Sequence, residues 1–323
     1  MEDMMISFLR TFTDYPFAVR VNGREYQIGE GKPEFAVTFK RPIPKRQLLT
    51  STSLALGEAY MDGDLEIEGD LYYALDHFLG QMGKFSTNEP ALKRLMRPST
   101  SKRCQKQEVS SHYDIGNEFY RLWLDETMSY SCGYFKHPDD TLRQAQINKV
   151  NYILQKLNLK PGMTLLDIGC GWGFLLMEAA KKYGVRGFGI TLSKEQKAEF
   201  ERRIREEHLE GVLEVELMDY RDLPACGRAF DRVVSVGMVE HVGRPNYQKF
   251  IRCVSSVLNE GGVFLLHFIS ALTEHTGDPW IRKYIFPGGT VPSLREMCGA
   301  MGEDGFHIMD VENLRLHYNK TLL

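Results

Sequence analysis

The chain of 323 residues contains no run of about 20 apolar residues, which is the length that a membrane-spanning helix needs. Residues 1–12 carry acidic side chains where a secretory signal would be positively charged, and their apolar stretch is short. The formal net charge is -3, so the chain lacks the positive excess that draws a protein onto nucleic acid. These absences predict a protein of the cytoplasm that binds no nucleic acid.

The chain also lacks paired ligands for a metal or closely spaced cysteines for a disulfide scaffold. Its six cysteines stand singly, and its nine histidines show no H-x-H or H-x-x-x-H spacing. Single cysteines indicate a reducing compartment, and the missing pairs predict that no metal is bound. The remaining composition, with 43% hydrophobic residues, supplies enough apolar side chains for one large or two ordinary domains.

The segment 165–173, Leu-Leu-Asp-Ile-Gly-Cys-Gly-Trp-Gly, has the pattern of a buried strand that breaks into a turn before a helix. Its three glycines allow the backbone to approach a bulky cofactor, and Asp167 ends the strand where its carboxylate can hold a polar group. A dinucleotide loop would need glycine or alanine where this chain has Phe174. The pattern predicts a pocket for S-adenosylmethionine, with an ordinary glycine-rich turn as the alternative.

Residues 1–90 have the pattern of a small α+β domain. Apolar residues predict strands over 17–21, 24–28 and 35–39, with Asn22-Gly23 as a hairpin turn, and helical spacing follows over 48–61 and 71–82. Residues 91–110 are predicted to be a linker, because prolines, a Ser/Thr cluster and seven basic residues against two acidic ones occur over 84–111. This linker is either a solvated hinge or a surface attracted to anionic lipid headgroups.

Residues 111–323 alternate between strand and helix patterns. Strands are predicted over 164–168, 185–190, 213–218, 230–236, 262–267 and 306–316, and helices over 142–157, 174–183, 194–208 and 247–258. This alternation predicts an α/β fold with a doubly wound parallel sheet, which binds ligands at the carboxyl ends of its strands.

Polar residues follow several of these strands, so the fold would gather them at one edge. Glu240 follows the fourth strand and His267 ends the fifth, although Glu240 could cap a helix and His267 could be a hydrogen-bonded core residue. After the second strand, where many nucleotide folds carry an acidic residue, Thr191, Ser193 and Gln196 offer neutral groups for the same hydrogen bonds.

Three further segments are candidates for the ligand site. Asp219-Tyr220 follows the third strand and is expected to border the adenine. The alternative for Arg221 and Asp222 in the same turn is a surface ion pair. The irregular, aromatic segments 112–120 and 129–134 are expected to fold over a ligand, or else to pack on the core.

With these motifs the chain resembles the cyclopropane-fatty-acyl-phospholipid synthases, relatives of the mycolic acid methyltransferases in the S-adenosylmethionine-dependent methyltransferase superfamily. The resemblance runs through most of the chain. It includes the segments 57–63, 112–117, 130–133, 166–173, 236–243, 280–287 and 317–321.

The resemblance implies a Rossmann-like methyltransferase sheet and transfer of the sulfonium methyl group to a cis double bond of a phospholipid acyl chain. Loss of a proton from the added methyl group then closes a cyclopropane ring, and a bound bicarbonate takes that proton. The residues implied to surround the bicarbonate are Cys132, Gly237, Glu240, His267, Ile269 through its backbone, and Tyr318. Those implied to hold the cofactor are Tyr130, Ser131, Asp167, Gly169, Cys170, Gly171, Trp172, Gly173, Thr191, Leu192, Ser193, Gln196, Asp219 and Tyr220.

The resemblance also implies a homodimer and peripheral docking on the anionic inner face of a membrane through the small domain and the linker. Apolar residues within 272–300, among them Trp280, Tyr284 and Phe286, suit either an acyl tunnel or an ordinary core. Members of this family continue beyond the sixth strand, so the catalytic domain is expected to lack its last helices and strand. Two alternatives stay open, a methyltransferase of another lipid or a small molecule without ring closure and a non-catalytic, cofactor-binding membrane protein.

Overall fold

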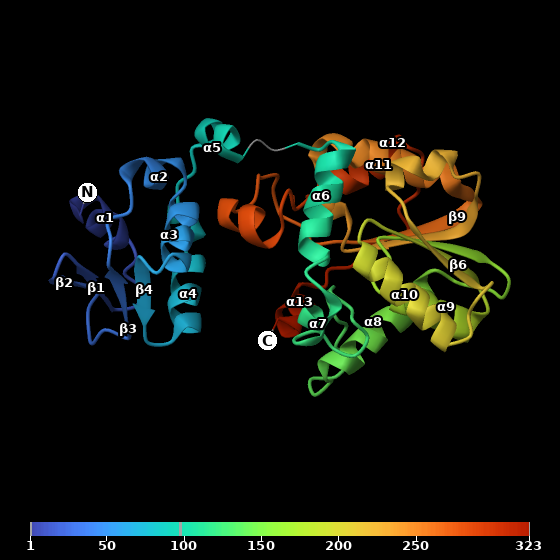
Figure 1. Cartoon of the computed structure of the whole chain (residues 1–323), viewed down its shortest axis with the longest axis horizontal. Coiled ribbons are helices and arrows are strands. Elements are labelled where there is room, and N and C mark those ends of the chain that lie inside the picture. Colours follow the sequence, from blue (N-terminus) through green and yellow to red (C-terminus); the bar gives the residue numbers. More distant parts are fainter. Residues whose placement is uncertain (1, 97–98, 323) are drawn as a thin grey trace. The chain divides into compact units, whose positions relative to one another are not determined.

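The computed structural model describes residues 2–96 and 99–322, which form two compact units (Figure 1). The first unit contains Met1–Pro98 and Gly277–Ile285, and the second contains Ser99–Thr276 and Phe286–Leu323. The chain therefore leaves the second unit after residue 276 and returns to it at residue 286. No helix in the described ranges combines the length and the apolar character that crossing a bilayer requires.

The first unit is built on a four-stranded sheet with the order β2-β1-β3-β4. Strands β1 (Phe17–Val21) and β2 (Arg24–Ile28) form an antiparallel hairpin, and β1 pairs in parallel with β3 (Phe35–Phe39). The hairpin turn has positive φ at both Asn22 (52°) and Gly23 (73°), as the sequence predicts. The sequence patterns missed the fourth strand, β4 (Leu65–Glu68), which is short.

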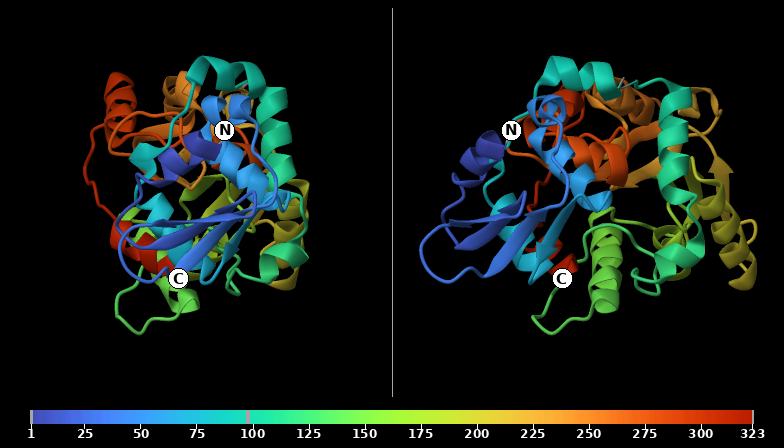
Figure 2. Two further views of the ribbon diagram at one scale, coloured as in Figure 1. Left: turned by 90° about the vertical axis from the view of Figure 1, so that its left-hand side faces the viewer. Right: turned by 60° about the vertical axis from the view of Figure 1, so that its left-hand side comes forward.

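The helices of the first unit are α1 (Glu2–Leu9), α2 (Lys45–Thr50), α3 (Thr52–Met61), α4 (Leu71–Leu79) and α5 (Glu89–Met96). Both α3 and α4 contact β4, and Figure 2 shows them beside the small sheet. The single helix predicted over 48–61 is wrong, because Ser51 adopts extended backbone and its side chain accepts a hydrogen bond from the Leu54 amide. This N-cap ends α2 and starts α3.

The second unit contains the parallel sheet that the sequence predicts. Its five strands are β5 (Thr164–Ile168), β6 (Arg186–Thr191), β7 (Leu213–Leu217), β8 (Phe230–Val236) and β9 (Leu258–His267), in the order β7-β6-β5-β8-β9. All neighbouring strands pair in parallel. The chain reverses its direction of winding between β5 and β8, and such a switch point is where doubly wound sheets bind ligands.

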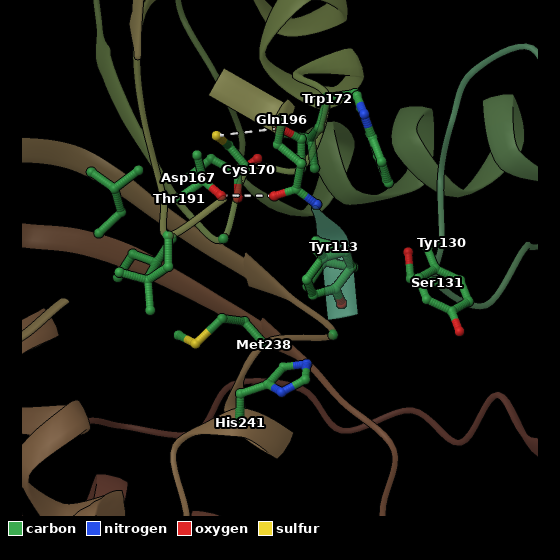
Figure 3. Close-up of a pocket in the computed structure, with 18 of the residues that line it drawn as sticks. Tyr113, Tyr130, Ser131, Asp167, Cys170, Trp172, Thr191, Gln196, Met238 and His241 are labelled. Atoms are coloured by element: carbon green, nitrogen blue, oxygen red, sulfur yellow. Dashed lines mark hydrogen bonds between the residues drawn. The ribbon is translucent and has the colours of Figure 1, made fainter. Parts of the chain in front are cut away.

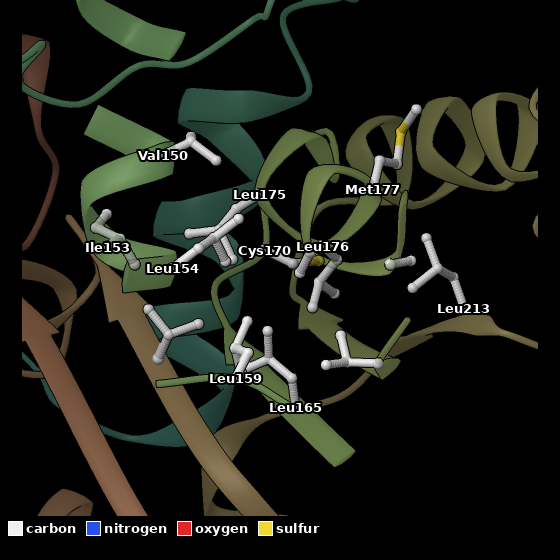
Figure 4. Packing of buried hydrophobic residues seen from close by; sticks show 14 of the residues in the cluster. Val150, Ile153, Leu154, Leu159, Leu165, Cys170, Leu175, Leu176, Met177 and Leu213 are labelled. Carbon is white, nitrogen blue, oxygen red and sulfur yellow. The ribbon is translucent and has the colours of Figure 1, made fainter. Parts of the chain in front are cut away.

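Helices cover both faces of this sheet. The chain forms α6 (Lys102–Tyr113), α7 (Asn117–Arg121), α8 (Leu142–Lys156), α9 (Phe174–Tyr183), α10 (Lys194–Glu206), α11 (Tyr247–Val257), α12 (Leu294–Glu303) and α13 (Arg315–Thr321). Buried residues of α8, α9 and α10 form one apolar cluster with the sheet (Figure 4). Residues of α11 and α12 form a second cluster with other sheet residues, so the doubly wound fold is confirmed.

The sixth strand predicted over 306–316 is absent from the described structure. Residues 306–314 form no regular element, and α13 begins at Arg315. Their alternating apolar residues match a strand pattern, but Met309 is 90% exposed and Val311 is 57% exposed. A strand needs a neighbour for its backbone hydrogen bonds, and no described strand pairs with this segment. The predicted helix 247–258 also ends one residue early, because β9 begins at Leu258.

The segment 91–110, predicted to be a linker, contains the end of α5 and most of α6. Ser101 caps α6 by accepting a hydrogen bond from the Cys104 amide. Gln105 is buried and donates to the carbonyl oxygens of His241 and Val242, at 2.8 Å and 2.7 Å. Residues 97 and 98 lie outside the described residues, whereas α6 is an integral part of the second unit.

We expect Gly173→Ala to lower the free energy of unfolding by about 3 kcal/mol, because a methyl group there requires both a positive φ and a shift of a buried ring. Gly173 has φ +86°, and an added Cβ would lie 2.0 Å from a ring carbon of Phe200. The matched control is Gly162→Ala, where φ is +83° and no atom lies within 4 Å of the added Cβ. This control is expected to cost about 1 kcal/mol. Equal losses in urea unfolding would contradict the packing argument.

Candidate functional site

A cavity lies at the carboxyl ends of β5, β6 and β8 (Figure 3). The glycine turn after β5 forms one wall, and the residues that follow β6, β7 and β8 continue it. Residues of α6, α8 and the segment 127–131 close the opposite side. Of the residues predicted to hold the cofactor, those that line this cavity are Tyr130, Ser131, Asp167, Gly169, Cys170, Gly171, Trp172, Thr191, Leu192, Gln196, Asp219 and Tyr220.

Asp167 is the most unusual side chain of the cavity wall. It is 3% exposed, and its Oδ1 atom has no hydrogen-bond partner in the described structure. Burial raises the pKa of this carboxyl to about 7, while the positive charge of Lys149 acts in the opposite direction. A buried carboxylate oxygen without a donor is costly, so this atom is suited to bind a positively charged ligand group.

The end of β6 is held by a local hydrogen-bond network. Thr191 donates its hydroxyl proton to Oε1 of Gln196 at 2.7 Å (Figure 3). Ser193 is fully buried, caps α10 by accepting from the Gln196 amide at 3.1 Å, and donates to Asp114 at 2.5 Å. Ser193 does not line the cavity, and neither does Gly173, which begins α9 against Phe200. Ser193 and Gly173 instead lie at the N-terminal ends of α10 and α9.

The Asp219 carboxylate forms a buried ion pair with Arg221. The Arg221 guanidinium donates to both carboxylate oxygens, at 2.7 Å and 2.5 Å, and the two side chains are only 8% and 5% exposed. Burial alone would raise the pKa of Asp219, but the hydrogen bonds from Arg221 outweigh it and the pKa is lowered. The alternative of a surface pair between Arg221 and Asp222 is wrong, because Arg221 pairs with Asp219 and Asp222 pairs with Lys102.

The residues predicted to surround the bicarbonate meet behind this cavity. Glu240, in the short helix η3 (Val239–His241), accepts a hydrogen bond from the Ile269 amide at 2.7 Å, so it is not a helix cap. Its other oxygen, Oε2, is buried without a partner, and burial raises the pKa of this carboxyl to about 7. Gly237, which lines the cavity, donates its amide to the His267 carbonyl at 2.9 Å.

His267, Cys132 and Tyr318 complete this group. Nδ1 of His267 is buried without a partner in the described structure, and burial, assisted by the charge of Lys149, lowers the histidine pKa to about 4. Burial raises the pKa of Tyr318, and the nearby Glu240 and Cys132 act in the same direction. Tyr318, Glu240 and Cys132 are therefore close enough to interact electrostatically. Neither these residues nor His267 line the cavity itself.

The aromatic segments fold against the glycine turn. Tyr120 is 1% exposed and its ring lies 5.1 Å from that of Trp172, whose indole donates to Asn117 at 2.7 Å. Tyr130 lies 5.9 Å from Tyr120 and reaches the cavity. One part of these segments thus packs on the core and another part lines the cavity, and folding over a ligand stays a prediction.

The apolar residues expected to form an acyl tunnel are divided between the two units. In the first unit Trp280 packs so closely on α3 that a Cβ at Gly57 would lie 2.3 Å from its ring, and Tyr284 donates to Glu58 at 2.8 Å. In the second unit the ring of Phe286 lies 4.9 Å from His112. Trp280 and Tyr284 therefore serve packing within the first unit.

The sequence patterns missed several residues that line the cavity, chief among them Lys149 on α8. This side chain is 5% exposed and donates from Nζ to the Ser131 hydroxyl at 2.7 Å. The sequence signal that could have indicated it is its position on the apolar face of a helix, which it shares with the buried residues Ala145, Val150 and Ile153. The other unpredicted lining residues include Gln105, Val109 and Met128.

Known proteins are similar to the chain in sequence over most of its length. The family model described as mycolic acid cyclopropane synthetase matches residues 100–323, and one described as a domain of unknown function matches residues 4–90. The chain is 40% identical over 312 residues to a probable fatty acid methyltransferase of Pseudomonas putida, a match that covers 93% of this chain and 77% of that protein.

Two further similarities bear on the site. The chain is 40% identical over 296 residues to the cyclopropane-fatty-acyl-phospholipid synthase of Escherichia coli K12, which covers 89% of this chain and 74% of that protein. A crystal structure of the mycolic acid cyclopropane synthase CmaA1, complexed with SAH and CTAB, matches with a TM-score of 0.62 and 37% identity. That match covers 67% of this chain and 80% of the other.

We expect Arg221→Leu to destabilise the protein by about 3 to 5 kcal/mol at pH 7, because it leaves the Asp219 carboxylate buried and unpaired. The control Lys102→Leu breaks a pair whose side chains are 49% and 53% exposed, and is expected to cost less than about 1 kcal/mol. The lowered pKa of Asp219 contributes stability above its unfolded pKa of about 4, and this contribution is lost as the pH falls through the folded pKa. The loss caused by Arg221→Leu should therefore shrink in acid, and a loss that does not depend on pH would contradict the assignment.

Proposed function

The chain belongs to the family of mycolic acid cyclopropane synthetases and cyclopropane-fatty-acyl-phospholipid synthases, and on this premise we propose that it forms cyclopropane rings in phospholipid acyl chains. The predicted family, the methyltransferase fold and the enzyme class are confirmed by the similarities above. The proposed reaction transfers a methylene group from S-adenosylmethionine to a cis double bond of an unsaturated acyl chain. The observation that carries the proposal is the pair of buried, unpartnered atoms Oε2 of Glu240 and Nδ1 of His267, with Tyr318 close enough to Glu240 to feel its charge.

In this proposal, different residues of the cavity bind different parts of the cofactor. The unpartnered oxygen of Asp167 binds the ammonium group of the methionine part, which restores a hydrogen bond to a buried carboxylate. The polar groups of Thr191 and Gln196 face the ribose, and Asp219-Tyr220 borders the adenine. Because Asp219 is already held by Arg221, its carboxylate is fixed in position before the cofactor arrives.

The residues behind the cavity fit a small oxyanion such as bicarbonate, which would supply a weak base for the proton released at ring closure. Glu240 with a pKa of about 7 retains a proton for much of the time at neutral pH, so Oε2 is able to donate to an anion. Tyr318 offers a hydroxyl donor, and the charge of Lys149 reaches both Cys132 and His267. A positively charged environment with unpaired donors stabilises an anion that water does not reach.

Burial of polar atoms in this part of the structure also bears on the cationic intermediate of the proposed reaction, which has to be kept from water. Transfer of a methyl group to an alkene leaves a positive charge on a carbon atom, and water would convert that carbon to an alcohol. Cys132 is 5% exposed, and Glu240 and His267 each present a buried polar atom. In this proposal these buried atoms face the side from which the proton is removed, whereas Ile269, whose amide binds Glu240, is 38% exposed.

We also propose that the protein associates with membranes at their anionic surface. Lys93 and Arg94 lie on α5, and the third basic residue of this stretch, Arg97, falls outside the described residues. Side chains of this kind are attracted to anionic headgroups within about one Debye length. Unchanged co-sedimentation of a Lys93→Glu, Arg94→Glu variant with anionic vesicles at low salt would contradict this role. The homodimer stays a prediction.

We expect the purified protein, incubated with S-adenosylmethionine and vesicles of an unsaturated phospholipid, to add one methylene group to the lipid. Mass spectrometry detects the added mass, but a methyl-branched alkene has the same mass as a ring. Proton NMR of the extracted lipid separates the two, because only cyclopropane methylene protons resonate at very high field. Saturated phospholipid vesicles are the control. A branched alkene would support a methyltransferase without ring closure, and cofactor binding without any lipid product would support a non-catalytic protein.

We expect Glu240→Gln to reduce turnover roughly 100-fold or more while leaving the affinity for S-adenosylhomocysteine nearly unchanged. The substitution removes an ionisable group that binds the Ile269 amide and faces the oxyanion site, but it does not touch the cofactor cavity. The control is Glu58→Gln, which changes a carboxylate in the first unit that pairs with Lys283. Calorimetric titration reports affinity and the lipid assay reports turnover. Equal losses of the two in Glu240→Gln would refute the assigned role.

A further inference from the structure

Lys149 is a buried cation that the proposed chemistry above does not use directly. Its side chain projects from α8 into the cavity wall, is 5% exposed, and makes one described hydrogen bond, to the Ser131 hydroxyl at 2.7 Å. It forms no ion pair within 4 Å with any carboxylate of the described residues, and Asp125 and Asp167 act on it only electrostatically. A buried ammonium with a single neutral partner is energetically expensive, so an anion in the cavity would stabilise it.

The nearest carboxylates do not fill this role. The carboxylate of Asp125 accepts hydrogen bonds from the amide and the hydroxyl of Thr127, at 3.0 Å and 2.9 Å. Asp167 interacts electrostatically with Lys149, yet its Oδ1 atom has no partner in the described structure. The cavity wall therefore carries one buried cation and one buried carboxylate that do not pair directly with each other.

This separation of charges matches a zwitterion. The methionine part of S-adenosylmethionine carries an ammonium group and a carboxylate on the same carbon atom. We propose that Lys149 and Ser131 bind the carboxylate of this group while Asp167 binds its ammonium, an inference that rests on the proposed use of this cofactor. Lys149 then recognises the amino-acid end of the ligand and not its adenosine.

The hydrogen bond between the two side chains prepares Ser131 for this contact. Because the Ser131 oxygen accepts from Lys149, its own proton is available for another acceptor. The segment that carries Ser131 is anchored independently by Gln146, one turn earlier on α8, which donates to the carbonyl oxygens of Ser129 and Ser131 at 3.3 Å and 2.8 Å. Holding this loop therefore does not require the charge of Lys149.

The charge state of Lys149 agrees with such a role. Burial lowers its pKa to about 8, while Asp125, Cys132 and Asp167 act in the opposite direction. The side chain is therefore mostly protonated at pH 7, and a bound carboxylate would favour the protonated form further.

The test compares S-adenosylhomocysteine with its decarboxylated analogue, which keeps the adenosine and the amino group. Calorimetric titration at pH 7 should show that the wild-type protein prefers the carboxylate form by roughly 10- to 100-fold. In Lys149→Met this preference should fall to about threefold or less, and Lys149→Arg should restore part of it. Lys156→Met is the matched control, because it removes a lysine of the same helix that pairs with Asp310 and Glu312 outside the cavity and should leave the ratio unchanged.

An unchanged preference in Lys149→Met would overturn the proposal. Lys149 would then stabilise the anion of the oxyanion site and not the carboxylate of the cofactor. If Lys149→Met does not fold, as judged by circular dichroism, Lys149→Gln carries the same comparison, because it is also uncharged. The titrations contain no lipid. Binding that prefers the carboxylate form, without formation of a cyclopropane lipid, would refute the proposed function alone. Formation of a cyclopropane lipid without this binding preference would refute this inference alone.

Discussion

Burial of ionisable groups without direct ion pairs is the constraint on which the site depends. Asp167, Glu240, His267 and Lys149 all lie in an environment that disfavours their charged forms, as the directions of their pKa shifts show. Each of the first three has an atom with no hydrogen-bond partner in the described structure. Such groups reduce the stability of the fold, and they are retained where ligands supply the missing partners.

The parallel sheet makes this arrangement possible. Strands that run in one direction end at one edge, so residues distant in sequence, such as Asp167 and Gly237, reach the same cavity. The glycine turn after β5 is held from beneath by Phe200, whose ring fills the space that a side chain at Gly173 would need. The segment before the sheet then closes the cavity, because Tyr120 and Trp172 pack on each other. Asp167 and Lys149 thus lie between this floor and the aromatic residues, at 3% and 5% exposure.

The two parts of the site have different chemical tasks. As proposed above, the cavity wall would bind a zwitterionic cofactor through the Asp167 carboxylate and the Lys149 ammonium group, and the residues around Glu240 and Tyr318 would donate to a small anion. Lys149 lies between them, since its charge reaches Asp167 on one side and Cys132 and His267 on the other. A change of its charge would therefore be felt in both parts of the site, which is why ligand selectivity and turnover have to be measured separately.

The sequence by itself determined the fold class, the bounds of most strands and the glycine turn, because these features follow from periodicity and turn chemistry over a few neighbouring residues. It also placed Asp167, Glu240 and His267 at strand ends. Tertiary structure alone decided that Arg221 pairs with Asp219 and not with Asp222, that Lys149 faces Ser131, and that residues 306–314 form no strand. These outcomes depend on which side chains long-range packing brings within hydrogen-bonding distance of one another. The local sequence does not determine those distances.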